Sequence, residues 1–188
     1  ASVVKAILSF AKVDLIYLFK SVTIVAVSIL LVFFVGMEMY AEIDKGIRLP
    51  EYYASSGRLA TSISQSFHFL GALILVYFVN DLYWRSSATN FYLIEQSTFY
   101  SKVKLKGHLV SVSTLIVFFT VLLVLLALVF QVSYGYFHIN WQAYLGVVVF
   151  NTLPLMLLAV FLIIVNSLLK HKYAALGVSI LVVILLTT

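Results

Sequence analysis

The chain has 188 residues, of which 63% are hydrophobic and 10% are charged. Soluble domains contain roughly 45–50% apolar and about 25% charged residues. This composition therefore excludes a soluble enzyme, a nucleic-acid-binding protein and a disordered chain, and it identifies an integral membrane protein. The net charge of +5 comes from 12 Lys and Arg against 7 Asp and Glu, and in a membrane chain such an excess indicates topology. Cysteine is absent, which excludes disulfides and thiolate chemistry.

The first 19 residues carry too many charges to cross a bilayer. Ser2, Lys5, Ser9 and Lys12 recur at helical spacing and form one polar stripe. Apolar side chains fill the other face, a pattern typical of a helix that lies in the membrane interface. We expect such an interfacial helix over 1–19, and the alternative is a cytoplasmic loop that leads into the first span.

Long runs without charge predict about five transmembrane spans. The spans lie near 18–39, 60–81, 108–130, 142–168 and from 173 onward. Because backbone groups in lipid must pair within their own segment, we predict an all-α fold, a polytopic transmembrane helix bundle. The fifth span is shorter than the roughly 20 residues that a bilayer core requires, and Ala1 stands where a start Met would. We therefore expect this single transmembrane domain, 1–188, to be part of a longer chain.

The distribution of Lys and Arg predicts a cytoplasmic N-terminus in the cell membrane. With that orientation nine basic residues fall on the cytoplasmic side and three outside, as the positive-inside rule requires. The cytoplasmic residues are Lys5, Lys12, Lys20, Arg85, Lys102, Lys104, Lys106, Lys170 and Lys172.

The longest predicted cytoplasmic segment is 82–107. Apolar residues around Phe91 stand among polar neighbours, which favours a short amphipathic helix that packs on the membrane or on a cytoplasmic partner. Lys102, Lys104 and Lys106 also form a basic collar that would hold the next helix at lipid headgroups. The collar explains the lysines but leaves the apolar residues without a role.

Motifs of membrane enzymes and metal sites are missing. The sequence contains no HExxH, no GxSxG and no phosphate-binding GxxxxGK[ST] motif. The four histidines show no ligand spacing, so we predict no catalytic residue, no metal and no cofactor on this chain. Any ATP with its Mg²⁺ would then bind to a partner subunit.

A few polar residues lie inside the spans. Ser64, Gln65 and His68 crowd the outer third of the second span, where they would line a pathway or cap a helix end. Asn151 lies close to Pro154 in the fourth span, and Pro154 should bend that helix because it cannot bond to the preceding turn. We expect Asn151 to help satisfy the backbone that Pro154 frees. Packing between helices is the alternative for each of these residues.

The segment FVNDLYWRSSATNFYLIEQSTFYSKVKLKGHL (78–109) resembles the cytoplasmic turn of type-2 ABC transporter permeases. Arg85 matches the arginine of that turn, and Lys104 or Lys106 matches the lysine that opens the third span. NSLLKHKYAALG (166–177) is similar to a turn of the long-permease subgroup that is sometimes fused to a zinc aminopeptidase domain.

The resemblance implies the permease part of an ATP-driven exporter. The segment 82–107 would couple to a separate P-loop ATPase subunit, and a second permease bundle, in the same or another chain, would complete the transporter. Ser64, Gln65 and His68 would line the path of an apolar cargo. The coupling residues would be Arg85, Phe91, Leu93, Ile94, Glu95 and Lys102.

The sequence leaves two other functional classes open. A membrane scaffold or assembly subunit without transport activity would share the helices and the collar but would not bind an ATPase. A membrane enzyme is disfavoured by the missing motifs.

Overall fold

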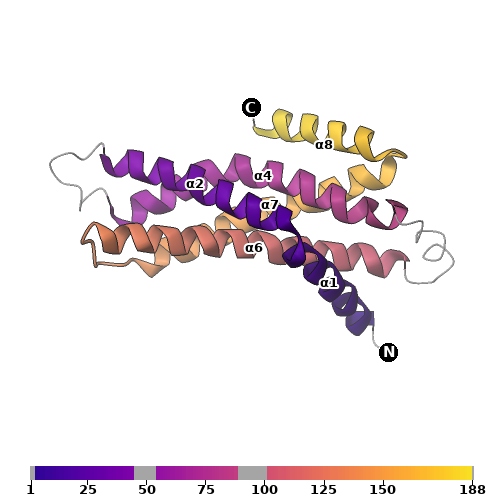
Figure 1. The fold of residues 1–188 in the computed structure, drawn as a ribbon, viewed down its shortest axis with the longest axis horizontal. Helices are drawn as coiled ribbons and strands as arrows, with labels where there is room; N and C mark the ends of the chain where they lie inside the picture. The colour runs from indigo at the N-terminus through magenta and orange to yellow at the C-terminus, as the bar shows by residue number, and fades with distance from the viewer. Residues whose placement is uncertain (1–2, 45–53, 89–100, 188) are drawn as a thin grey trace. The chain divides into compact units, whose positions relative to one another are not determined.

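A computed structural model describes residues 3–44, 54–88 and 101–187. Within these ranges the chain forms six helices and no strand, which confirms the predicted all-α fold (Figure 1). The helices are α1 (Val3–Lys20), α2 (Val22–Asp44), α4 (Ser56–Ala88), α6 (Ser101–Ser133), α7 (Trp141–Leu168) and α8 (Lys172–Thr187).

Four of these helices, α2, α4, α6 and α7, are long and apolar enough to cross a membrane. Large apolar side chains lie exposed along them, among them Phe150 at 77% and Leu157 at 70% of full exposure. Lipid solvates such side chains, whereas water does not. The chain is therefore a multi-pass membrane protein. The fifth predicted span forms α8, an apolar helix of 16 residues.

The helix ends correct several predicted boundaries. The first span was placed from residue 18, but α1 continues to Lys20, and α2 begins after a turn in which Ser21 N–H donates to Leu18 O over 3.0 Å. The second and third helices continue into 82–107, since α4 reaches Ala88 and α6 begins at Ser101. Charge ends a hydropathic run but does not interrupt backbone hydrogen bonding, so hydropathy alone underestimates the length of a helix that leaves the membrane.

The chain forms two compact units, each assembled from separate segments. Unit 1 consists of Ala1–Ser21, Ala72–Leu115 and Met156–Thr188, and unit 2 consists of Val22–Gly71 and Ile116–Leu155. Unit 1 thus combines α1 and α8 with parts of α4, α6 and α7. Unit 2 combines α2 with the remainder of those three helices.

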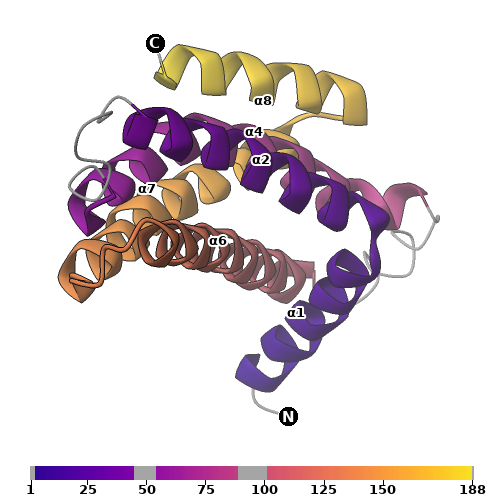
Figure 2. The ribbon, with the colours of Figure 1, turned by 60° about the vertical axis from the view of Figure 1, so that its left-hand side comes forward.

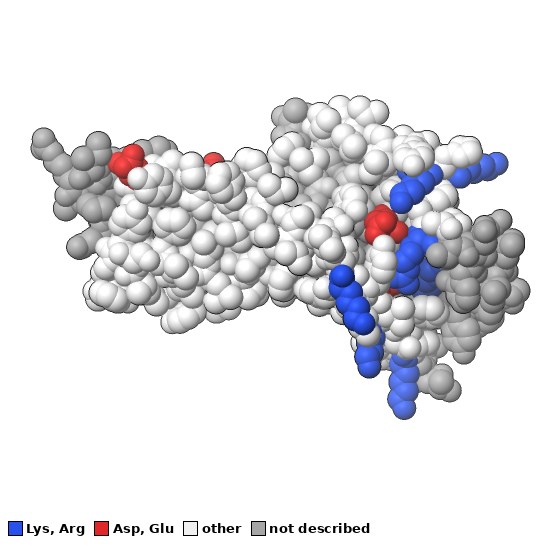
Figure 3. Space-filling model, in the orientation of Figure 1, with Lys and Arg blue, Asp and Glu red and all other residues white. Residues whose placement is uncertain are grey.

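Charged residues are divided unevenly between the units. Among the described side chains, unit 2 holds Arg58 and three acids, whereas unit 1 holds two acids and most of the basic residues. The basic residues of unit 1 are Lys5, Lys12, Lys20, Arg85, Lys104, Lys106, Lys170 and Lys172. Figure 3 shows Lys and Arg side chains gathered on one part of the visible face.

Candidate functional site

A carboxylate is buried on the packed face of α1. Ala11, Asp14 and Leu18 recur at helical spacing, and all three are buried, with Asp14 at 2% exposure. The predicted polar stripe at Lys5, Ser9 and Lys12 is exposed, as an amphipathic helix requires. A buried carboxylate needs cationic or hydrogen-bonding partners, because desolvation of an isolated charge costs many kcal/mol.

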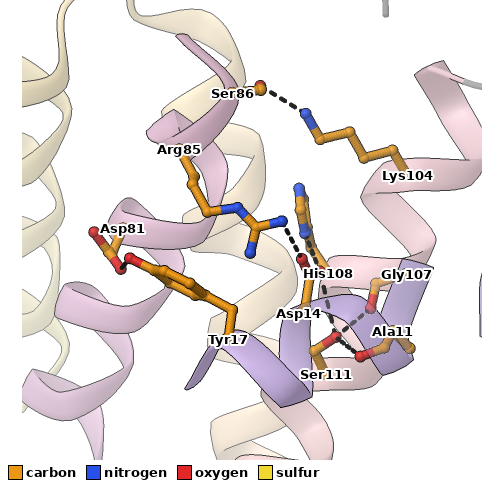
Figure 4. Close-up of polar contacts among 10 residues, drawn as sticks. All are labelled: Ala11, Asp14, Tyr17, Asp81, Arg85, Ser86, Lys104, Gly107, His108 and Ser111. Carbon is orange, nitrogen blue, oxygen red and sulfur yellow. Dashed lines mark hydrogen bonds and ion pairs between the residues drawn. The ribbon is translucent and has the colours of Figure 1, made fainter. Parts of the chain in front are cut away.

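Two other helices supply those partners (Figure 4). His108 Nδ1 lies 2.5 Å from one carboxylate oxygen of Asp14, and an Arg85 guanidinium nitrogen lies 3.4 Å from the other. Ser111 Oγ is 3.4 Å from the oxygen that His108 contacts. We call Asp14, Arg85, His108 and Ser111 the Asp14 cluster. It joins α1 to both α4 and α6.

The two nitrogen-bearing partners of Asp14 differ in burial. The His108 side chain is 5% exposed, whereas the Arg85 side chain is 30% exposed. Arg85 also lies over the ring of Tyr17, with 4.6 Å between the guanidinium carbon and the ring centroid. A cation–π contact of this kind contributes about 0.5–1 kcal/mol at a partly exposed site. Arg85 therefore holds α1 at two points while its side chain still reaches the surface.

A second, more exposed acid adds further contacts on the same side of α4. Tyr17 Oη donates to Asp81 over 3.1 Å, and Lys172 Nζ lies 3.8 Å from the same carboxylate. Burial, and then the charge of Asp81, raise the pKa of Tyr17 above its usual value. Because Asp81 and Lys172 are both partly exposed, their ion pair contributes little to stability.

The helix ends on either side of residues 89–100 are connected to each other. Lys104 Nζ, in the first turn of α6, donates to Ser86 Oγ, near the end of α4, over 2.7 Å. Gly107 lets α1 pass close to α6 (Figure 2), since a Cβ at Gly107 would lie 2.7 Å from Phe10 Cβ. The Asp14 cluster begins one residue later, at His108. Two sets of contacts, the Lys104–Ser86 hydrogen bond and the Asp14 cluster, thus join the ends of α4 and α6.

Asp14, His108 and Ser111 do not have the arrangement of a catalytic triad. A Ser-His-Asp triad requires the serine hydroxyl at the imidazole nitrogen that the acid does not hold. Ser111 Oγ instead lies near Asp14 and donates to Gly107 O over 2.9 Å, and Ser111 is fully buried. No substrate could reach that hydroxyl.

A neutral polar network also lies in unit 1. Asn80 and Trp84 of α4 both donate to Asn166 Oδ1, over 3.0 and 2.9 Å, and Asn80 donates to the carbonyl of Lys172 as well. Asn166 in turn donates to Leu162 O within α7. These bonds fix α4 against α7 and the start of α8.

Unit 2 contains a buried network without any charge, which we call the Gln131 network. Gln131 accepts a 2.6 Å bond from Tyr144 Oη and donates to Ser56 Oγ over 3.0 Å. Ser56 Oγ also accepts the backbone N–H of Asn140 over 2.9 Å. Asn140 Oδ1 then caps the N-terminus of α7 at Gln142 N. The network joins the starts of α4 and α7 to the end of α6.

Of the expected coupling residues, Arg85 is the one whose side chain the structure describes. Its guanidinium group binds Asp14 within the chain. Phe91, Leu93, Ile94 and Glu95 lie outside the described residues. Lys102 belongs to α6, but its side chain is also outside the described part.

The expected pathway residues lie on α4 in unit 2. Gln65 and His68 are exposed, and Ser64 is half-buried and accepts a 3.3 Å bond from Asn151. The Asn151 amide, which is expected to help satisfy the backbone freed by Pro154, donates to Ser64 of the neighbouring α4. α7 continues through Pro154 from Trp141 to Leu168. Nearby, Ser66 donates to Glu38 of α2.

Sequence reasoning missed Asp14 and His108 as site residues. Asp14 is the sole acid of α1 and falls in register with Ala11 and Leu18, which was the available signal. His108 was considered only as a metal ligand. Among the described residues no group of three or more metal-ligating side chains occurs.

Known proteins give no further guide to the site. No family model, no characterised protein and no solved structure matches the chain.

Proposed function

We propose that the chain is the membrane-embedded permease part of an ATP-driven exporter, and that a separate P-loop ATPase subunit docks on the segment 82–107. The observation that carries the proposal is the two sets of contacts between the helix ends on either side of residues 89–100. Lys104–Ser86 and the Asp14 cluster connect the end of α4, the start of α6 and α1. A push on the segment would therefore move three helices together, which is what an energy-coupling element must do.

The excess of basic residues in unit 1 supports a cytoplasmic N-terminus. Its basic side chains outnumber the acids Asp14 and Asp81, and Asp14 is buried. Positive residues favour the cytoplasmic side of a membrane protein. An ATPase subunit would then meet the segment 82–107 from the side where ATP is found.

The exposed pair Gln65 and His68 supports a cargo path that a second permease bundle completes. Polar side chains at membrane depth are costly unless they face a partner or a cavity. We propose that these residues, with Ser64, line the path of an apolar cargo. An activity that is lost only for hydrophilic cargo in Gln65 and His68 variants would contradict this assignment.

Co-purification in mild detergent, followed by an ATPase assay, tests the proposed function. We expect a P-loop subunit to co-purify, and Phe91→Asp or Leu93→Asp to weaken its binding about tenfold or more, as the loss of an anchor residue does. Tyr173→Asp is the matched control, because Tyr173 is an 84% exposed aromatic residue of unit 1 outside the segment. A preparation without any ATPase would support the scaffold alternative, and unchanged binding in both variants would remove the coupling role of 82–107.

A further inference from the structure

His108 has one ring nitrogen that the cluster leaves without a partner. Nδ1 contacts Asp14, but Nε2 is buried and has no hydrogen-bond partner among the residues that the structure describes. A neutral imidazole that donates from Nδ1 presents a free lone pair at Nε2. Such a nitrogen can accept a proton without breaking an existing bond.

The charge balance of the cluster changes when that proton binds. With neutral His108, the negative charge of Asp14 is matched by one positive charge, that of Arg85. With protonated His108, two cations share one carboxylate in a buried site. Burial penalises the excess charge, so the group that can return to water should leave.

Arg85 is the group that can leave. Its side chain is 30% exposed and its distance to Asp14 is 3.4 Å, whereas His108 is 5% exposed and lies at 2.5 Å. A protonated imidazole also strengthens its bond to the carboxylate, since charge-assisted bonds are roughly twice as strong as neutral ones. The competition therefore favours His108.

We propose that His108 is a proton-binding site that controls the attachment of α1. Protonation at His108 Nε2 commits Asp14 to α6 and releases Arg85, so that the link between α1 and α4 loosens while the link between α1 and α6 tightens. This device does not depend on the proposed ATP coupling.

The charged and titratable groups around the cluster come from four helices. Arg85 and Asp81 on α4, Tyr17 on α1 and Lys172 on α8 form the neighbouring chain of contacts, and Lys104 lies one turn before His108 on α6. Burial and the charge of Asp81 raise the pKa of Tyr17, which moves it further from the range where histidine titrates. Asp81 bonds to Tyr17 and faces Lys172, and it does not contact Asp14 directly.

A distance measurement on the full chain in lipid nanodiscs tests the proposal. Because the chain has no cysteine, spin labels can be attached at Val13→Cys on α1 and Ser87→Cys on α4, both exposed positions of unit 1. Between about pH 8 and about pH 5, the range in which histidine titrates, we expect a longer distance to appear. Its population should rise at least about threefold and return when the pH is restored.

Two histidine variants separate this mechanism from a general acid effect. His108→Gln keeps an amide that can donate to Asp14 but cannot take up the proton, so its distances should not respond to pH. His171→Gln changes an exposed histidine of the same unit and should respond as the parent chain does. A response that persists in His108→Gln, or a parent chain that does not respond, would overturn the proposal.

A second measurement covers the case in which His108→Gln fails to fold. In a chain with His68, His138 and His171 replaced by Gln, the NMR signals of the remaining imidazole report His108 alone. We expect them to shift over the same pH range as the distance. Signals that stay constant while the distance changes would also overturn the proposal.

Discussion

Units 1 and 2 both bury polar groups where several helices meet, but they use different chemistry. The Asp14 cluster of unit 1 joins helices through ionisable side chains, and His108 Nε2 has no partner among the described residues. The Gln131 network of unit 2 joins helices through neutral groups that bond to one another. A neutral network holds its helices equally well at all physiological pH values, whereas a charged one changes with protonation. If His108 takes up a proton as proposed, the helix contacts of unit 1 change with pH and those of the Gln131 network do not.

The largest loss of unfolding free energy should come from a substitution of Asp14. Asp14→Asn keeps the shape of the side chain but removes the charge that balances Arg85. Loss of one partner of a buried ion pair costs about 3–5 kcal/mol, and because Arg85 is partly exposed we expect about 2–3 kcal/mol. Denaturant unfolding in micelles measures the loss. Asp44→Asn, at an exposed acid of unit 2, should stay within about 0.5 kcal/mol of the parent chain, and an equal loss there would refute the difference between the units.

A break in the Gln131 network should cost less unfolding free energy than the loss of the Asp14 charge, and this cost should not depend on pH. Gln131→Leu leaves the hydroxyls of Ser56 and Tyr144 without their buried partner, which costs about 1–3 kcal/mol. We expect the loss in unfolding free energy to be the same at about pH 8 and about pH 5, because no group of the network titrates there. Gln142→Leu, an exposed position on the same helix as Tyr144, is the control. A loss that grows at acid pH would show that unit 2 is also charge-dependent.

The smallest changes in unfolding free energy should come from substitutions of two glycines, one in each unit, whose surroundings are packed differently. At Gly107 in unit 1 an added Cβ would meet Phe10 Cβ at 2.7 Å, whereas at Gly36 in unit 2 the nearest atom, of Leu126, would lie at 3.6 Å. Overpacking costs about 1–3 kcal/mol, and replacement of a helical Gly by Ala regains about 0.5–1 kcal/mol. We expect Gly107→Ala to destabilise by about 1 kcal/mol and Gly36→Ala to stabilise slightly. Unfolding midpoints of the two variants check the difference, and a stable Gly107→Ala chain would contradict the close contact of α1 with α6.

Hydropathy could predict the helices because a membrane requires every span to be a long run of apolar residues without charge. Runs without charge located α2, α4, α6 and α7, and the polar stripe of Lys5, Ser9 and Lys12 identified α1 as amphipathic. The same rule could not place helix ends that carry polar and charged residues, such as the end of α4 at Ala88. The turn at Ser21 left no signal in composition, and the first span was predicted to begin too early.

The site could not be predicted in the same way because its contacts join distant parts of the chain. Asp14 and His108 are 94 positions apart, and a single sequence carries no record of which residues meet. Asn151 shows the same difficulty on a smaller scale. Its proximity to Pro154 in sequence suggested a local role, but its amide bonds to Ser64, 87 positions away.

The distance in sequence between Asp14 and His108 also sets the order of events during synthesis. A ribosome that adds 5–20 residues per second needs about 5 to 20 s to extend the chain by the 94 positions that separate them. During that interval the Asp14 carboxylate has no partner on α6, and its hydration keeps α1 among water and lipid headgroups. The contact between α1 and α6 therefore cannot form before His108 has been added, and a nascent chain released earlier would carry an Asp14 carboxylate without its partner on α6.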